Sequence, residues 1–260
     1  MSAEEVKIKK GDVIRLEYSG YLADSNELFD TTIMEVAKQG GIFNEKVPYG
    51  PIPLLVGSGR VFEGLEEAVI GASVGEEREV VIPPEKAAGA RDPKLVENIP
   101  LRDFLKQDIE PRIGMEVNIK NRLGIVIAVT PRMVRVDFNR RYAGRTLKYK
   151  FKVVARIDDP AEKALAIIEM DYGTKDNFSV SIEGDTYTIV LPDVCKYDQK
   201  WMIAKYKVVA DLREGLKARV IRFVEEYIKA DEEKKAEEKK EQGTEAEVKA
   251  EEREPEELPQ

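Results

Sequence analysis

The chain has 260 residues, of which 42% are hydrophobic, enough to build one large domain or two to three smaller ones. It has no histidine and one cysteine, Cys195, which excludes histidine-triad hydrolases, histidine-based zinc sites and a disulfide framework. No apolar run reaches the about 18 residues of a membrane span, and residues 1–10 lack a signal-peptide core. We therefore expect a cytoplasmic protein that does not span a membrane.

The net charge of −8 is concentrated at the C-terminal end. Residues 231–260 hold 13 acidic and 6 basic side chains, whereas the other 230 residues hold 37 and 36. Because this tail has almost no apolar side chain to bury, we expect it to be disordered or a solvated lone helix.

The first predicted strand lies within Lys9–Gly20, where Ile14, Leu16 and Tyr18 alternate with polar side chains. A turn-forming composition follows at Leu22–Leu28, and an aromatic residue then stands beside a carboxylate. Residues 33–53, rich in glycine and proline, read as a long connection of the kind that is often functional.

Residues 57–70 read as a polar turn, two apolar residues at a strand end (Val61 and Phe62), and a short amphipathic helix, Leu65–Ile70. Gly64 suits the start of that helix, where a residue without a Cβ takes non-helical dihedrals cheaply. A lone helix this short is marginal in water, so we expect a curled sheet to wrap it. A further strand, Glu77–Ile82, ends at two prolines.

Taken in order, the segments VIRLEYSG, FD, VGSGRVFEGLEEA and GEEREVVIP resemble the FKBP-type peptidyl-prolyl isomerases. The resemblance covers Lys9–Ile82 and resumes at Ala143–Arg156, which is similar to the family's final strand. Between them, residues 91–139 resemble the insert-in-flap domain of the SlyD-like branch, and the long 33–53 connection resembles its archaeal long form.

The insert is predicted to hold a helical piece, Leu101–Ile109, and strands at Glu116–Lys120, Gly124–Val129 and Met133–Phe138. Its expected small core is Leu101, Phe104, Leu105, Val117, Ile119, Ile125, Ile127, Val134 and Val136.

Residues 158–229 lie outside the family core. We expect a helix at Pro160–Met170 capped by Asp158–Asp159, a hairpin turning at Gly184–Asp185, a strand at Trp201–Asp211, and a closing helix at Leu216–Ala230.

The predicted fold class is α+β: an FKBP-like antiparallel sheet wrapped around a short helix, a small mainly-β insert domain and a C-terminal α+β domain. The predicted domains are residues 1–90 plus 140–157 (isomerase), 91–139 (insert-in-flap chaperone), 158–230 (C-terminal α+β) and 231–260 (charged tail).

By resemblance, seven residues fall on the family's pocket positions. Leu65 would be the floor, often tryptophan in the family, while Phe29 and Tyr149 would be aromatic walls and Tyr18 and Asp30 polar groups at the edge. The set is Tyr18, Phe29, Asp30, Val61, Phe62, Leu65 and Tyr149. The five other than Tyr18 and Asp30 are apolar or aromatic and could be plain core. One departure is Ala88, which stands where the family commonly has an aromatic residue whose hydroxyl bonds the substrate, so we expect weaker peptide binding with activity retained.

The resemblance implies an isomerase that needs no cofactor, nucleophile or metal and acts on X–Pro bonds of unfolded or nascent polypeptides, with a chaperone-like insert. The alternatives are a holdase with little isomerase activity and a ribosome-associated folding factor.

The ribosome alternative depends on six basic residues within Asn139–Lys152, with Tyr142 and Tyr149 interleaved. Alternation of Lys148, Lys150 and Lys152 favours an ordinary solvent face instead. Cys195 is read as a buried structural thiol. The C-terminal domain is a candidate homodimer interface, and its sequence does not choose between dimerisation, client binding and docking.

Overall fold

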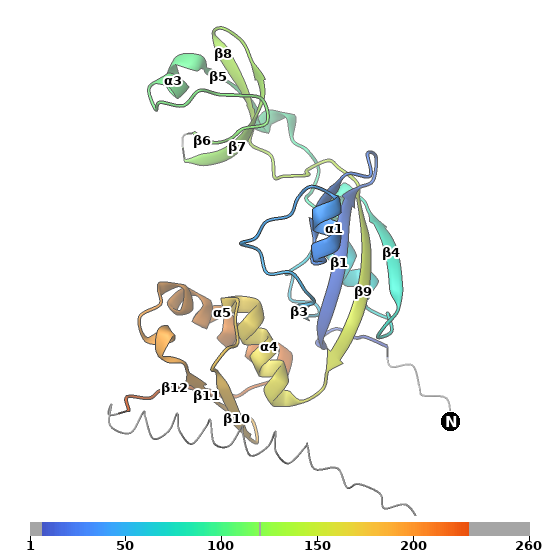
Figure 1. Cartoon of the computed structure of the whole chain (residues 1–260), viewed down its shortest axis with the longest axis vertical. Coiled ribbons are helices and arrows are strands. Elements are labelled where there is room, and N and C mark those ends of the chain that lie inside the picture. Colours follow the sequence, from blue (N-terminus) through green and yellow to red (C-terminus); the bar gives the residue numbers. More distant parts are fainter. Residues whose placement is uncertain (1–6, 120, 229–260) are drawn as a thin grey trace, which may run out of the picture.

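A computed structural model describes residues 7–119 and 121–228, which form three separate β-sheets with short helices packed on them (Figure 1). The mixed content and the largely antiparallel pairing confirm the predicted α+β class. None of the helices in these residues is long and apolar enough to cross a membrane. The predicted behaviour of the charged tail concerns residues outside the described ranges.

The N-terminal sheet has five strands in the order β2-β1-β9-β4, with β3 paired to β1. The long strands β1 and β9 run antiparallel, with Tyr18 opposite Phe151 and Gly20 opposite Tyr149. Apolar side chains of β1 and β9 pack on a short helix, α2, which bears out the expectation of a sheet curled around a helix. The elements of this unit are β1 (Val13–Leu22), β2 (Leu28–Thr31), α1 (Met34–Gln39), β3 (Ile52–Leu55), α2 (Glu63–Val69), β4 (Glu77–Ile82), a 3₁₀ turn (Pro84–Lys86) and β9 (Leu147–Ile157).

Helix α2 begins two residues earlier than predicted, with Phe62 as its N-cap. Gly64 therefore lies inside the first turn, and its role differs from the one expected. A Cβ at this position would overlap Cγ2 of Ile82, so the glycine lets the helix approach strand β4 closely. Because β3 ends at Leu55, Val61 and Phe62 belong to a loop, residues 57–62, and not to a strand end.

The long connection after β2 is more ordered than its glycine and proline content suggested. It contains α1, whose Ala37 is fully buried, and ends in β3. The prediction of an irregular connection over residues 33–53 is therefore wrong at its two ends, where a helix and a strand lie.

The insert forms a four-stranded antiparallel sheet in the order β5-β8-β7-β6. The predicted helix is shorter than expected and leaves Leu105 54% exposed. The inward face of β7 also differs, because Val126 and Gly124 are buried while Ile125 and Ile127 lie on the other face. The elements are a 3₁₀ turn (Pro93–Leu95), β5 (Val96–Pro100), α3 (Leu101–Leu105), β6 (Glu116–Ile119), β7 (Arg122–Val129) and β8 (Met133–Asp137).

The C-terminal unit has a three-stranded sheet, β10-β11-β12, covered by two helices. Its first helix and its hairpin are as predicted, and Asp159 caps the helix by accepting from the Glu162 backbone N–H. Two predictions are wrong: residues 201–211 lie in helix α5, and residues 220–225 form a strand. The elements are α4 (Pro160–Tyr172), β10 (Ser179–Glu183), β11 (Thr186–Leu191), a 3₁₀ turn (Asp193–Lys196), α5 (Gln199–Leu216) and β12 (Val220–Glu225).

The C-terminal unit packs against the N-terminal sheet through α4, which lies beside β1 and β3 (Figure 1). Val13 of β1 and Leu55 of β3 belong to the core of the C-terminal unit, whereas their neighbours Ile14 and Leu54 belong to the N-terminal core. The two units therefore share strands β1 and β3 as a common wall.

Candidate functional site

The structure brings the aromatic and polar residues of the predicted pocket together at one end of β1, β2 and β9. The Tyr18 ring lies edge-on to the Tyr149 ring with centroids 5.6 Å apart, and the Phe29 ring lies 5.8 Å from it. Phe62 adds a third contact to Tyr149 at 6.4 Å. The Tyr18 hydroxyl donates a 2.9 Å hydrogen bond to Oδ2 of Asp30, which is exposed. Tyr149 is thus the centre of an aromatic group with one carboxylate at its rim.

The remaining two predicted residues contribute apolar surface to the same cluster. Leu65 is 1% exposed and belongs to the core that contains Tyr149. Val61 is partly buried and packs against that core from the 57–62 loop. Six of the seven predicted residues therefore line one apolar cluster, and the seventh, Asp30, stands at its edge.

Burial raises the pKa of both tyrosines of the site further above neutral pH. It is the largest cause that raises the pKa of Tyr18, followed by the negative charge of Asp30 and the hydrogen bond to it. The pKa of Tyr149 is raised by burial and then by the neighbouring Tyr18 and Asp30. Each phenol is consequently a hydrogen-bond donor at neutral pH.

Gly20 leaves the space in which the two main rings meet. A Cβ built on Gly20 would lie 2.8 Å from Cζ of Phe29 and 3.0 Å from Cε1 of Tyr149. Because glycine is the residue without a Cβ, its presence here allows both rings to approach the β1 backbone.

The predicted set lacks Tyr142. This residue follows the insert, adopts a left-handed backbone (φ +67°), and places its ring 4.5 Å from that of Phe29. The sequence marked it only as an aromatic within a basic segment; the signal that could have found it is its place just before the final strand. Ala88, at the position where the family commonly has an aromatic residue, is buried, so no ring occupies that position.

The lysines of β9, Lys148, Lys150 and Lys152, have acidic and polar partners, as on an ordinary solvent face. Lys150 and Lys152 lie 4.0 and 3.7 Å from carboxylates of Glu79 and Glu77 on β4. A groove of about 480 Å³ lies beside these charges and is also lined by Glu17, Tyr18 and Tyr21, so it borders the aromatic cluster at Tyr18.

Two other sequence predictions concern titratable side chains. Cys195 is buried, as predicted, and burial raises the pKa of its thiol. Within residues 7–119 and 121–228, no three His, Cys, Asp or Glu side chains gather in a way that could hold a metal ion.

Comparison with known proteins gives three family matches along the chain. Residues 4–110 match the FKBP-type peptidyl-prolyl cis-trans isomerase family, residues 97–142 match the IF domain of FKBP26, and residues 160–228 match the FKBP26 C-terminal domain. The insert match, residues 97–142, overlaps most of the predicted range of 91–139 and begins and ends a few residues later.

Curated relatives agree with these matches. A short-type peptidyl-prolyl cis-trans isomerase of Methanocaldococcus jannaschii is 44% identical over 155 residues, covering 60% of this chain and 96% of the relative. The FKBP-type isomerases SlyD of Helicobacter pylori and Escherichia coli are 32% and 31% identical, covering 51% and 55% of this chain and 74% of each relative. The chain therefore belongs to the FKBP-type peptidyl-prolyl cis-trans isomerases, in the SlyD-like branch with an insert and a C-terminal domain, and is an enzyme of that type.

Proposed function

We propose that this isomerase accelerates X–Pro isomerisation in unfolded or nascent polypeptides, with the aromatic cluster around Tyr149 as the site that receives the proline. The observation that carries the proposal is the convergence of Phe29, Phe62 and Tyr149 beside the Tyr18–Asp30 hydrogen bond. A proline ring is compact and apolar, and three aromatic rings with a leucine floor offer it an apolar surface.

Such a site needs no covalent chemistry. Rotation about the imide bond has a barrier of roughly 18–20 kcal/mol because the nitrogen lone pair is delocalised into the carbonyl. The planar form is the more charge-separated one, so a site that excludes water disfavours it relative to the twisted transition state. Each ~1.4 kcal/mol of that preference gives about tenfold in rate.

The polar groups orient the bound peptide. Tyr18 is held by Asp30, while the Tyr149 hydroxyl makes no hydrogen bond within the described part of the chain. The Tyr149 phenol can therefore donate to a carbonyl oxygen of the peptide, whereas Tyr18, whose hydrogen goes to Asp30, can accept from a peptide N–H. A hydrogen bond that strengthens as the imide twists would contribute to rate and not only to binding.

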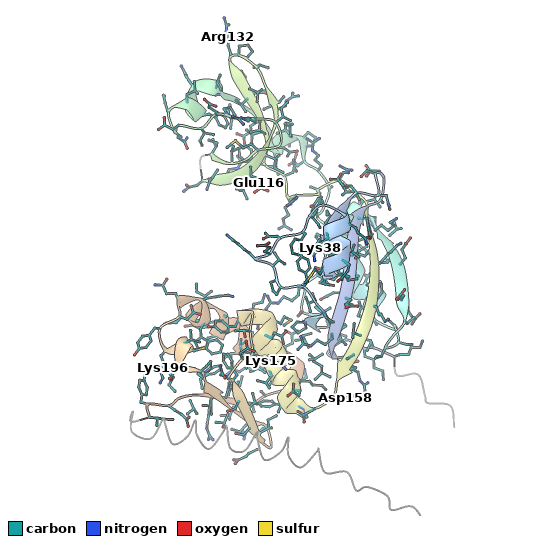
Figure 2. The ribbon with its side chains drawn as sticks, viewed as in Figure 1. Lys38, Glu116, Arg132, Asp158, Lys175 and Lys196 are labelled. Carbon is teal, nitrogen blue, oxygen red and sulfur yellow. The ribbon has the colours of Figure 1, made fainter. Side chains whose placement is uncertain are left out.

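We also propose that the insert holds unfolded chain. Its tip, where Figure 2 labels Arg132, carries a shallow groove of about 400 Å³. The groove is lined by Pro100, Leu101, Leu105, Pro131 and Arg132, and Leu105 is largely exposed. A polypeptide held there would present its prolines to the site at a raised effective concentration.

The holdase alternative is separated from the isomerase by proline-limited refolding of a slow-folding protein. We expect the full chain to accelerate refolding and Asp30→Ala to lose most of that acceleration, because Tyr18 then loses its anchor. Asp185→Ala is the matched control, since Asp185 pairs with Arg219 in the C-terminal unit, far from the site in sequence and fold. No acceleration by the full chain would refute the isomerase proposal.

Suppression of aggregation tests the insert. Leu105→Asp should weaken the suppression of aggregation while leaving isomerisation of a tetrapeptide intact. Val81→Asp, at a similarly exposed apolar position on β4, should change neither the suppression of aggregation nor the isomerisation rate. Loss of tetrapeptide turnover in Leu105→Asp would contradict separate roles for the two units. The ribosome contact, tested by salt-sensitive ribosome pelleting, and a cytoplasmic location stay predictions.

A further inference from the structure

A buried group of charges joins the C-terminal unit to the loop that carries Val61 and Phe62. Arg60 of that loop forms an ion pair with Asp171 of α4, and its Nη2 lies 3.6 Å from Oδ2 of Asp211 on α5. The side chains of Asp171, Asp211 and Arg60 are 0%, 11% and 23% exposed. We call these three residues the Arg60 cluster.

Charges this deeply placed must be paired, because removing a charge from water is costly unless an opposite charge compensates it. Burial lowers the pKa of Arg60, and the charge of Asp211 opposes that shift. Burial likewise raises the pKa of Asp211, and Arg60 opposes it. Since two carboxylates face one guanidinium, Arg60 cannot leave without exposing both acids to an apolar surrounding, so its position is firmly held.

Residues 57–59, which precede Arg60 in the loop, make few hydrogen bonds. Gly57 and Gly59 both adopt positive φ angles, +94° and +70°, and two glycines in so short a segment increase its conformational freedom. The hydrogen bonds of these three residues are a 3.2 Å bond from the Ser58 N–H to the Leu55 carbonyl and a 3.0 Å bond from the Gly59 N–H to Glu66. Arg60 is therefore the tie that connects this loop to a different unit of the protein.

The residues next to Arg60 are part of the candidate site. Val61 packs on the N-terminal core, and Phe62 contacts the ring of Tyr149 and is also the N-cap of α2, which carries Leu65. A change in the Arg60 backbone would consequently move the wall formed by Val61 and Phe62.

We propose that the C-terminal unit acts on the isomerase site through Arg60, which is a positioning residue that keeps the Val61–Phe62 wall in the form that binds peptide. The short-type relative is matched over 96% of its length by 155 residues of this chain, which leaves no room for a further unit of this size. The C-terminal unit is thus an addition whose influence on the site must pass through its contacts with the N-terminal sheet. This inference rests on the proposed function of the Tyr149 site.

A second ion pair between the same units supplies the control. Arg15 of β1 donates from Nη1 and Nη2 to the Glu169 carboxylate at 2.7 and 2.6 Å, so it also joins the N-terminal sheet to α4. Arg15 lies within strand β1 and not in the 57–62 loop. Loss of either pair should weaken docking of the C-terminal unit, but only loss of the Arg60 pair should disturb the site.

The experiment measures kcat and KM of the full chain for isomerisation of a proline-containing tetrapeptide by a protease-free exchange method. The variants are Arg60→Met, Asp171→Asn and their double variant, compared with Arg15→Met, Glu169→Gln and theirs. Suppose that the variants lower the fraction of molecules whose 57–62 loop is in the form that binds peptide to about a third to a tenth. KM then rises about threefold to tenfold with kcat nearly unchanged. The double variant of Arg60→Met and Asp171→Asn should raise KM as much as each single variant does. Arg15→Met, Glu169→Gln and their double variant should keep the wild-type KM.

Arg60→Lys keeps the charge and removes the planar fork, so it remains informative if the neutral variants fail to fold. We expect it to raise KM by less than Arg60→Met does. An unchanged KM in the folded Arg60-cluster variants, or an equal rise in both sets, would overturn this inference and leave the proposed function intact. A wild-type protein that does not isomerise the tetrapeptide would instead overturn the proposed function.

Discussion

The hydrogen bond between Tyr18 and Asp30 gives a direct test of the polar edge of the site. Tyr18→Phe removes the hydroxyl and keeps the ring, so the edge-on contact with Tyr149 at 5.6 Å survives. The lost bond runs 2.9 Å to a carboxylate, and bonds to charged groups contribute about 1.5–3 kcal/mol. Because Asp30 is exposed and water can replace the phenol, we expect a value at or just below the low end, about 1–1.5 kcal/mol, which corresponds to a roughly fivefold to twelvefold loss.

The assay is kcat/KM for tetrapeptide isomerisation, with thermal unfolding measured on the same samples. Tyr21→Phe is the matched control, since Tyr21 lies three residues along β1 and its ring faces Lys148 on the outer side of the sheet. We expect Tyr21→Phe to leave kcat/KM at the wild-type value. Equal kcat/KM in Tyr18→Phe and wild type would refute the view that this hydroxyl and its anchor take part in the reaction.

Other perturbations address the walls, the floor, the charges and the assembly. Gly20→Ala should lower kcat/KM severalfold by pushing apart the two rings that face it, and an unchanged rate would show that the rings do not define the site. Leu65→Ala should destabilise by about 2–5 kcal/mol and raise KM, whereas Val69→Ala on the same buried helix should affect stability alone, as thermal unfolding and kinetics would show. The ion pair with Arg78 lowers the pKa of Glu76 to about 2. The ionised Glu76 carboxylate therefore stabilises the fold fully above pH 4.5, and this stabilisation is lost as the pH falls towards 2. Glu76→Gln should therefore unfold more readily than wild type at pH 7 and equally at pH 2, and a constant difference would contradict this. If two copies join through the exposed face of α5, Tyr206→Glu, at a position 84% exposed, should halve the mass in solution, and an unchanged dimer mass would place the interface elsewhere.

The N-terminal sheet was predictable because its signals are local. Strand β4 has the predicted bounds, and in β1 the predicted inward residues Ile14 and Leu16 are buried while Arg15 between them is less so. What the sequence could not give was the role of Gly64, since its contact with Ile82 joins residues 18 positions apart. Tyr142 was missed for the same reason, because its partner Phe29 lies on the far side of the insert.

The insert shows how a small error in phase changes a predicted core. In β7 the buried side chain is Val126, one residue away from the predicted Ile125 and Ile127. A run of consecutive apolar residues has no period of its own, so the inward face is decided by pairing with β8, where a bulge lies between Val126 and Ala128.

The C-terminal unit shows where propensity misleads. Residues 201–211 are rich in aromatic and β-branched side chains, which favoured a strand, yet Trp201, Ala204, Val208 and Leu212 are buried at helical spacing in α5. The helix also has a cap in Asp198, whose side chain accepts from the Lys200 N–H. These two signals were present in the sequence and outweigh the propensity.

Topology explains why the following segment then had to be a strand. Strand β12 pairs parallel with β11, and parallel neighbours need a crossover of about a dozen residues or more, usually a helix. Helix α5 is that crossover, so a strand at 201–211 followed by a helix would have left β11 without its parallel partner. The same crossover carries Asp211 to the Arg60 loop. The element that connects the strands of the C-terminal sheet is therefore also the one that brings a carboxylate to the loop beside the proposed site.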